Sequence, residues 1–192
     1  MLKSNQDSAG GVFLMNTLEI YDRVQKIKDK YRTNDPFELL EGLGAYVRWT
    51  DAFAADGLKG FCYFVNRVLF VVINEKLDEH EQRLVAMHEA AHLILHRKEL
   101  MVAPLRDFGL FNMVTQTEAQ ANYFAADFLI DDTDVISLVS EYEYDFFQTC
   151  QALCVPPDLM TFKLYSMTQR GIRCNIPLEI NSRFLGKKNL CS

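Results

Sequence analysis

Residues 78–96 read DEHEQRLVAMHEAAHLILH and carry a long helical pattern. Asp78 and Glu81 form a D-x-x-E start signal, in which the side chain of the first residue accepts a hydrogen bond from the first turn. Helix-forming residues then continue to His96 without a glycine or a proline. We therefore expect one long helix here, and the residues with the clearest chemical potential lie on it.

The segment before this helix has the pattern of a small sheet. Three short runs are rich in β-branched and aromatic residues, and turn dipeptides at residues 56–57 and 66–67 separate them. The runs cover residues 45–49, 59–65 and 68–74. We expect a small antiparallel sheet with a hairpin, packed beside helix 78–96.

Further helices are predicted on both sides of this unit. Three start signals stand out: Asn16 or Thr17, Asp35 with Pro36, and Thr117 with Gln120. Together with the apolar periodicity, they predict helices over residues 18–31, 36–42, 118–130, 134–141, 145–154 and 157–170. The expected fold class is α+β, mainly helical.

Charge and cysteine usage limit the partners and the compartment. The formal net charge of −6 argues against a surface that as a whole attracts nucleic acid or anionic lipid. The longest apolar stretch near the N-terminus, residues 12–15, is far too short for a signal or membrane span. Five scattered cysteines suit free thiols in a reducing compartment, so we expect a cytoplasmic protein. Cys150 and Cys154 are expected to be small buried residues.

The motif His88-Glu89-Ala90-Ala91-His92 lies inside the long helix and has the form H-E-x-x-H. Side chains four residues apart project from nearly the same helix face, with Cβ atoms about 5–6 Å apart, so both imidazoles can reach one ion. Glu89 is rotated by about 100° from His88, which places its carboxylate beside the ion as a general base. A catalytic zinc site needs three protein ligands, so a third must come from elsewhere.

Glu118 is the preferred third ligand, because it lies in the first turn of the next strong helix. Asn122 follows one turn later on the same face and could orient an imidazole. The alternative is that Glu118 only complements the helix dipole and Asn122 is a surface amide. His96 is too far along the helix axis, about 12 Å from His88. It is expected to support the site from behind a ligand or to lie on the surface, and His80 is expected to be solvated.

These residues resemble the ImmA/IrrE metallopeptidases, small gluzincin-like zinc enzymes. The resemblance rests on residues 88–92, on Leu-Ile-Leu-His at 93–96, and on the block EAQANYFAADFL at 118–129. It covers residues 45–132, about half the chain. Two departures are Gln120, in place of the more usual acid, and Ile130-Asp131, where Met-Pro commonly falls.

The resemblance implies a zincin-like fold with zinc (Zn²⁺) held by His88, His92 and Glu118. It also implies that Glu89 is the catalytic base and that Asn122 supports the metal site. Members of this family are described as cleaving or inactivating a helix-turn-helix repressor, so the implied partner is a separate repressor protein of a mobile element or stress regulon.

The expected domain organisation follows from these assignments. Residues 1–11 are polar and contain glycine, and we expect a flexible N-terminal segment over residues 1–14. Residues 15–192 are expected to form a single zinc peptidase domain. Its metal core would cover about 45–132 and its C-terminal helical part about 133–192.

The expected reaction is hydrolysis of a peptide bond, with a strand of the 61–74 hairpin pairing with an extended substrate. Tyr123 and Tyr63 are conceivable donors to the oxyanion. The competing interpretation is a zinc-containing regulatory protein that sequesters its partner without proteolysis. Both remain open on the sequence.

The C-terminal part allows two further interpretations. Residues 146–170 have the outline of a helix-turn-helix, although packing or partner docking is favoured over DNA contact. The aromatic residues Tyr142, Tyr144, Phe146 and Phe147 could form a docking surface, but packing in the core is favoured.

Overall fold

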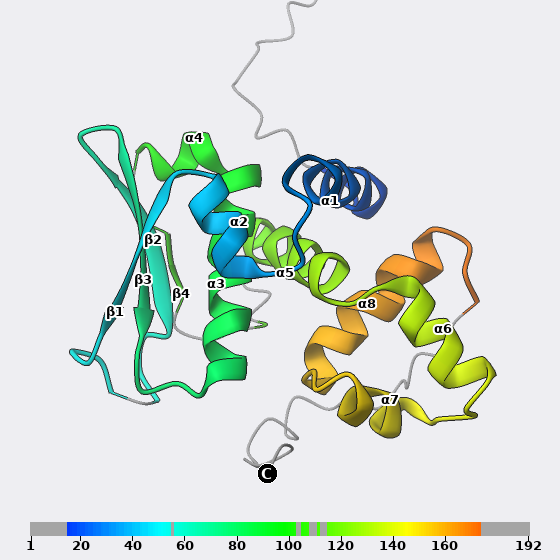
Figure 1. Ribbon diagram of the computed structural model, residues 1–192. Helices are drawn as coiled ribbons and strands as arrows, with labels where there is room; N and C mark the ends of the chain where they lie inside the picture. The colour runs from blue at the N-terminus through cyan, green and yellow to red at the C-terminus, as the bar shows by residue number, and fades with distance from the viewer. Residues whose placement is uncertain (1–14, 55, 103–104, 108–110, 112–114, 174–192) are drawn as a thin grey trace, which may run out of the picture.

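The computed structural model describes residues 15–54, 56–102, 105–107, 111 and 115–173 (Figure 1). The predicted flexible segment 1–14 lies outside these residues. Four strands are described: β1 (Ala45–Thr50), β2 (Gly60–Val65), β3 (Val68–Asn74) and β4 (Leu105–Asp107). The described helices are α1 (Thr17–Tyr31), α2 (Pro36–Gly42), α3 (Glu79–Leu95), α4 (Arg97–Leu100), α5 (Gln116–Leu129), α6 (Asp132–Ser140), α7 (Phe146–Ala152) and α8 (Pro157–Gln169).

The sheet and the helices segregate to opposite sides of the molecule. In Figure 1 the sheet lies to one side, α3 runs beside it, and α6, α7 and α8 lie on the far side of α5. Helix α3 contacts β2, β3 and α5, while α5 also contacts α1 and α8. The α+β fold class is confirmed. Within the described residues, no helix is both long and apolar enough to cross a membrane.

The sheet is mixed, so the prediction of an antiparallel sheet is wrong. The strand order is β1-β3-β2-β4, with β1 parallel to β3 and the β2–β3 and β2–β4 pairs antiparallel. Strand β2 follows β1 in the chain but is not its neighbour in the sheet, because β3 lies between them. A central strand buried on both faces is typically a continuous apolar run, as Val68–Ile73 is.

Strand β3 lies between β1 and β2, and β4 covers the start of β2, so these parts of the hairpin do not offer the free edge that was predicted to pair with a substrate. The edges of the sheet are β1 and β4. Strand β4 lies between the predicted helices 78–96 and 118–130, where no strand was predicted, and it pairs with Gly60–Cys62 of β2. Strand β4 therefore forms the edge of the sheet next to β2.

Helix α3 begins as predicted and is the most deeply buried helix of the described chain. Asp78 is its N-cap and accepts a hydrogen bond from the Glu81 amide at 2.8 Å. Every residue from Leu84 to Leu93 is buried. A helix that is buried all round needs elements on several sides, and α2, α5, β2 and β3 supply them.

The other local start signals are mostly confirmed. Asn16 forms a capping box at α1, and Asp35 caps α2, whose first residue is Pro36. Helix α5 starts earlier than predicted. Thr115, not Thr117, is its N-cap and accepts from the Glu118 amide at 3.2 Å. Glu118 therefore does lie in the first turn, at the third helical position.

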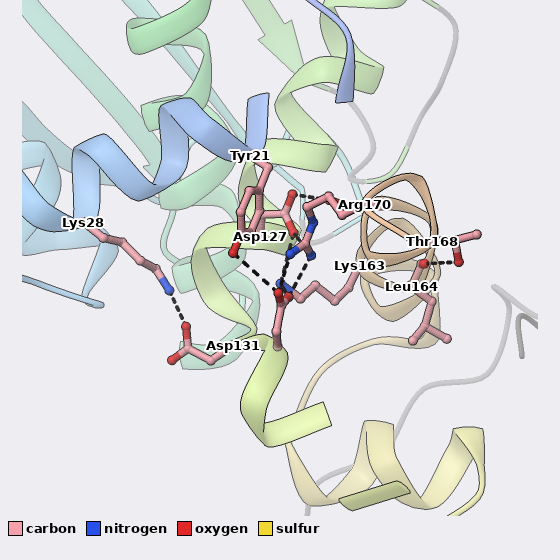
Figure 2. Close-up of polar contacts among 10 residues, drawn as sticks. Tyr21, Lys28, Asp127, Asp131, Lys163, Leu164, Thr168 and Arg170 are labelled. Atoms are coloured by element: carbon pink, nitrogen blue, oxygen red, sulfur yellow. Dashed lines mark hydrogen bonds and ion pairs between the residues drawn. The ribbon is translucent and has the colours of Figure 1, made fainter. Parts of the chain in front are cut away.

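An ion network fastens α8 and the start of α6 to α5 (Figure 2). The Lys163 ammonium is 1% exposed and lies 3.0 Å from Asp127 and 2.7 Å from Asp132. Arg170 donates to Asp132 at 2.8 Å and lies over the ring of Tyr21, 3.6 Å from its centroid. Two cations and two carboxylates thus balance each other in a largely buried cluster.

This network bears on the proposed helix-turn-helix. Helices α7 and α8 do form two helices joined by a short turn. Lys163 and Arg170, the cations of the second helix, are engaged in internal ion pairs and do not present their charge to a phosphate backbone. The arrangement favours packing over DNA contact for α8.

Two predictions of burial are wrong in part. Tyr142, Tyr144 and Phe147 are exposed to 62%, 37% and 55%, so only Phe146 of the aromatic run packs against the core. These rings lie at the end of α6 and the start of α7, where few other elements cover them. Cys150 is buried as expected, but Cys154 is exposed because it follows the end of α7.

Candidate metal centre

Three side chains from two helices converge on one point. The Nε2 atoms of His88 and His92 are 3.0 Å apart, and the Glu118 carboxylate lies 3.0 Å from the first and 3.4 Å from the second. The histidines are buried, and Glu118 is 18% exposed. The structure therefore brings together the residues that the sequence singled out, as a group that can hold a metal ion.

The spacing of these atoms fits a metal ion with tetrahedral coordination. Ligand bonds of about 2.0–2.1 Å at tetrahedral angles place neighbouring ligand atoms about 3.3 Å apart, close to the observed separations. Asn122 fixes the orientation of the first imidazole, because the Oδ1 atom of its amide lies 3.0 Å from Nδ1 of His88. With the proton on Nδ1, Nε2 of His88 has a lone pair and no proton. Lone pairs that face a carboxylate repel each other unless a cation lies between them.

The protonation of the cluster also suits a cation. Burial lowers the pKa of His92 to about 4, which keeps the imidazole neutral at physiological pH. Burial raises the pKa of Glu118, but its close contacts with the two imidazoles outweigh burial and hold this pKa well below its usual range. Two imidazoles and one carboxylate are the ligand set of the His₂Glu zinc peptidases.

Glu89 lies beside the cluster, on the side of the sheet. It is 1% exposed, and a Cβ atom added to Gly60 would lie 3.6 Å from its Oε1 atom. Burial and the neighbouring Glu89 carboxylate raise the pKa of the Cys62 thiol well above its usual value. The start of β2 thus forms the wall next to Glu89. No sequence pattern indicated Gly60 or Cys62 here, since only the packing of β2 against α3 brings them close.

Behind the ligands, two more residues join the site. His96, 3% exposed, places Nδ1 at 3.0 Å from Nδ1 of His92, so it supports the site from behind a ligand and does not lie on the surface. Its Nε2 atom lies 2.9 Å from Oε1 of Gln120. Gln120 was predicted only as part of a helix start, and its contact with His96 was missed.

The remaining candidates lie elsewhere. Tyr123 packs against Phe162 and Tyr165 of α8, and burial and Tyr165 raise its pKa to about 12. Tyr63 stacks on Phe61 and Phe70, on the opposite sheet face from Cys62. Neither is positioned by these contacts as an oxyanion donor. His80 is exposed in the first turn of α3, as expected.

Residues 40–154 match the family described as IrrE N-terminal-like domain, Peptidase_M78. The chain is also similar to "Uncharacterized immunity region protein 2" of Bacillus phage phi105, with 29% identity over 141 residues, which cover 73% of this chain and 85% of that protein. The family match covers more than half of the chain and contains all three converging side chains. The chain therefore belongs to the IrrE N-terminal-like peptidase family and is a metallopeptidase in which His88, His92 and Glu118 form a group that could hold a metal ion.

Proposed function

We propose that this protein is a zinc-dependent endopeptidase that cuts a peptide bond in a partner protein. The observation that carries the proposal is the convergence of two imidazoles and a carboxylate, with Glu89 buried beside them. Zinc suits this donor set, because nitrogen and oxygen ligands in a tetrahedral arrangement are typical of it.

When bound, the zinc ion supplies Lewis-acid polarisation of the scissile carbonyl and of the attacking water. Glu89 takes a proton from that water and later returns it to the leaving amine. The Glu118 carboxylate and the imidazoles hold the ion, and Asn122 keeps His88 in the required orientation.

Strand β4 offers a place for an extended substrate. Its outer edge has no strand partner among the described residues, and its inner edge pairs with Gly60–Cys62, next to Glu89. A peptide added along this edge would gain backbone hydrogen bonds and pass close to the base. We therefore assign the substrate-binding edge to β4 and not to the hairpin strands.

We further propose that the partner is a helix-turn-helix repressor, encoded separately by a mobile element or acting on a stress regulon. The support is the family resemblance and the printed name of the phage relative, which places that protein in an immunity region. Such a partner would be met in the cytoplasm, and the free, buried thiols of Cys62 and Cys150 suit a reducing compartment.

The test is a cleavage assay on the purified repressor encoded next to this gene. Glu89→Gln should retain bound zinc and lose cleavage by at least about 100-fold, because general base catalysis contributes about 10²–10⁴-fold. Glu79→Gln, an exposed carboxylate in the first turn of the same helix, is the matched control and should cleave normally. Chelation should abolish cleavage, and added zinc should restore it.

Two results would decide against the proposal. A Glu89→Gln protein that cleaves at the wild-type rate would show that Glu89 is not the base. A wild-type protein that binds zinc and the repressor but cuts nothing, while Glu89→Gln still relieves repression in cells, would establish sequestration instead.

A further inference from the structure

A continuous chain of hydrogen bonds runs from a metal ligand to the backbone at the start of α1. Nδ1 of His92 lies 3.0 Å from Nδ1 of His96, and Nε2 of His96 lies 2.9 Å from Oε1 of Gln120. The Gln120 amide nitrogen then donates to the Met15 carbonyl at 2.8 Å. His92, His96 and Gln120 are exposed by only 1%, 3% and 5%, so these three side chains are largely shielded from water.

The direction of every bond in this chain follows from its last member. A backbone carbonyl can only accept, so the Gln120 side chain must turn its NH₂ group toward Met15. Its oxygen then faces His96, which must carry its proton on Nε2 in order to donate. With that proton on Nε2, Nδ1 of neutral His96 is an acceptor, and His92 must donate to it from Nδ1.

The consequence falls on the other nitrogen of His92. A neutral imidazole that holds its proton on Nδ1 has a lone pair on Nε2, and this is the atom that faces His88 and Glu118. The reverse direction would place a proton on Nε2 of His92, where it would donate to Glu118 and block an ion. A carbonyl three hydrogen bonds away thus selects the tautomer that can bind metal.

We propose that His96 and Gln120 are positioning residues that hold His92 in the metal-binding tautomer, with the Met15 carbonyl as their anchor. This inference deepens the proposed function and rests on it, since it assumes that His92 is a ligand. It assigns a role to Gln120 that differs from helix capping. It also ties the metal centre to α1, an element outside the motif-bearing helices.

The first readout is the tautomeric state, which a merely structural role would not fix. The chain has four histidines, so the imidazole signals of ¹⁵N-labelled, zinc-loaded protein can be assigned by two-bond proton–nitrogen correlation. We expect His92 to carry its proton on Nδ1 and His96 to carry its proton on Nε2. A proton on Nδ1 of His96 would overturn the proposal.

The second readout is zinc affinity, measured by competition with a chromophoric chelator on the full chain. Gln120→Met removes both polar groups at nearly constant size and should weaken zinc binding by about 10-fold or more, as is typical when the partner of a metal ligand is lost. Gln120→Glu retains an acceptor for His96 and should bind within about threefold of wild type. Gln116→Met is the matched control, because Gln116 lies one turn earlier on α5 and lines the same cavity of about 400 Å³ at the start of α1.

The outcomes separate this inference from the proposed function. If the wild type binds zinc and cleaves but Gln120→Met and Gln116→Met have equal affinities, the positioning role is refuted and the enzyme stands. If the wild type does not bind zinc, the positioning role and the proposed function are both refuted. Should Gln120→Met not fold, His96→Asn and His96→Leu provide the same comparison, since only asparagine can keep an acceptor near the former Nδ1 atom.

Discussion

Lys163→Met removes the cation at the centre of the network in Figure 2, so that Asp127 loses its nearest cation and Asp132 keeps only Arg170. Breaking a buried ion pair from one side costs about 3–5 kcal/mol. Asp127 keeps the Ser166 hydroxyl at 2.6 Å and has Arg170 at 3.8 Å, so the lower end of that range applies. For a chain of this size, about 3 kcal/mol corresponds to a fall in Tm of about 6–12 °C.

The assay is thermal unfolding followed by circular dichroism, with a double-mutant cycle. Asp127→Asn preserves the size and shape of the side chain and an acceptor for the Ser166 hydroxyl. The Lys163→Met, Asp127→Asn double variant should lose less stability than the sum of the losses of the two single variants. Zinc affinity at 25 °C should not change, because Asp127 lies about 13 Å along α5 from Glu118. Equal Tm values for Lys163→Met and wild type, or strictly additive losses in the cycle, would refute the claim that this buried network holds α8 to α5.

Three further outcomes are expected. Burial raises the pKa of Asp132, but Arg170 and Lys163 outweigh burial and lower this pKa from 3.8 to about 2. The ionised Asp132 therefore contributes at most about 2 kcal/mol to the free energy of unfolding, fully present above pH 4 and lost as the pH falls through 2. Acid titration of Tm, with Asp132→Asn as the comparison, checks this. Asn122→Ala removes the acceptor of His88 and should weaken zinc binding by about 10-fold, whereas Asn122→Asp should not, by chelator competition. Gly60→Ala places a Cβ in a clash with Val85 and 3.1 Å from the Val72 carbonyl, so it should cost about 1–3 kcal/mol and lower kcat. An unchanged Tm and kcat would show that β2 does not brace α3 here.

The helices could be predicted from the sequence because their signals are local. Asn16, Asp35, Asp78 and Asp145 each accept a hydrogen bond from an amide two or three residues later, and such bonds require no knowledge of the rest of the fold. Strand order has no local signal. The parallel pairing of β1 with β3 depends on where the chain goes between residues 50 and 60, and β4 is three residues long in a segment with loop composition.

The metal ligands were easier to predict than the strand order and harder to predict than the helices. His88 and His92 follow from the helical period alone, and Glu118 could be chosen because a third ligand was required and the next helix began with a carboxylate. The structure brings these three side chains together. The environment of Glu89 could not be predicted, because Gly60 and Cys62 approach it from a strand that is remote in sequence.

Gln120 shows why the partners of the ligands are harder to find than the ligands themselves. It is two residues from Glu118 and therefore about 200° around the helix, on the face that periodicity assigns away from the metal. Its side chain reaches His96 because α5 crosses α3 at an angle, so that a residue from a different face of α5 meets the end of α3 (Figure 1). A crossing of this kind is a property of the packed helices and not of either sequence. The donor and acceptor of each bond, once the atoms are placed, follow from chemistry alone, and the Met15 carbonyl leaves only one arrangement for the tautomer of His92.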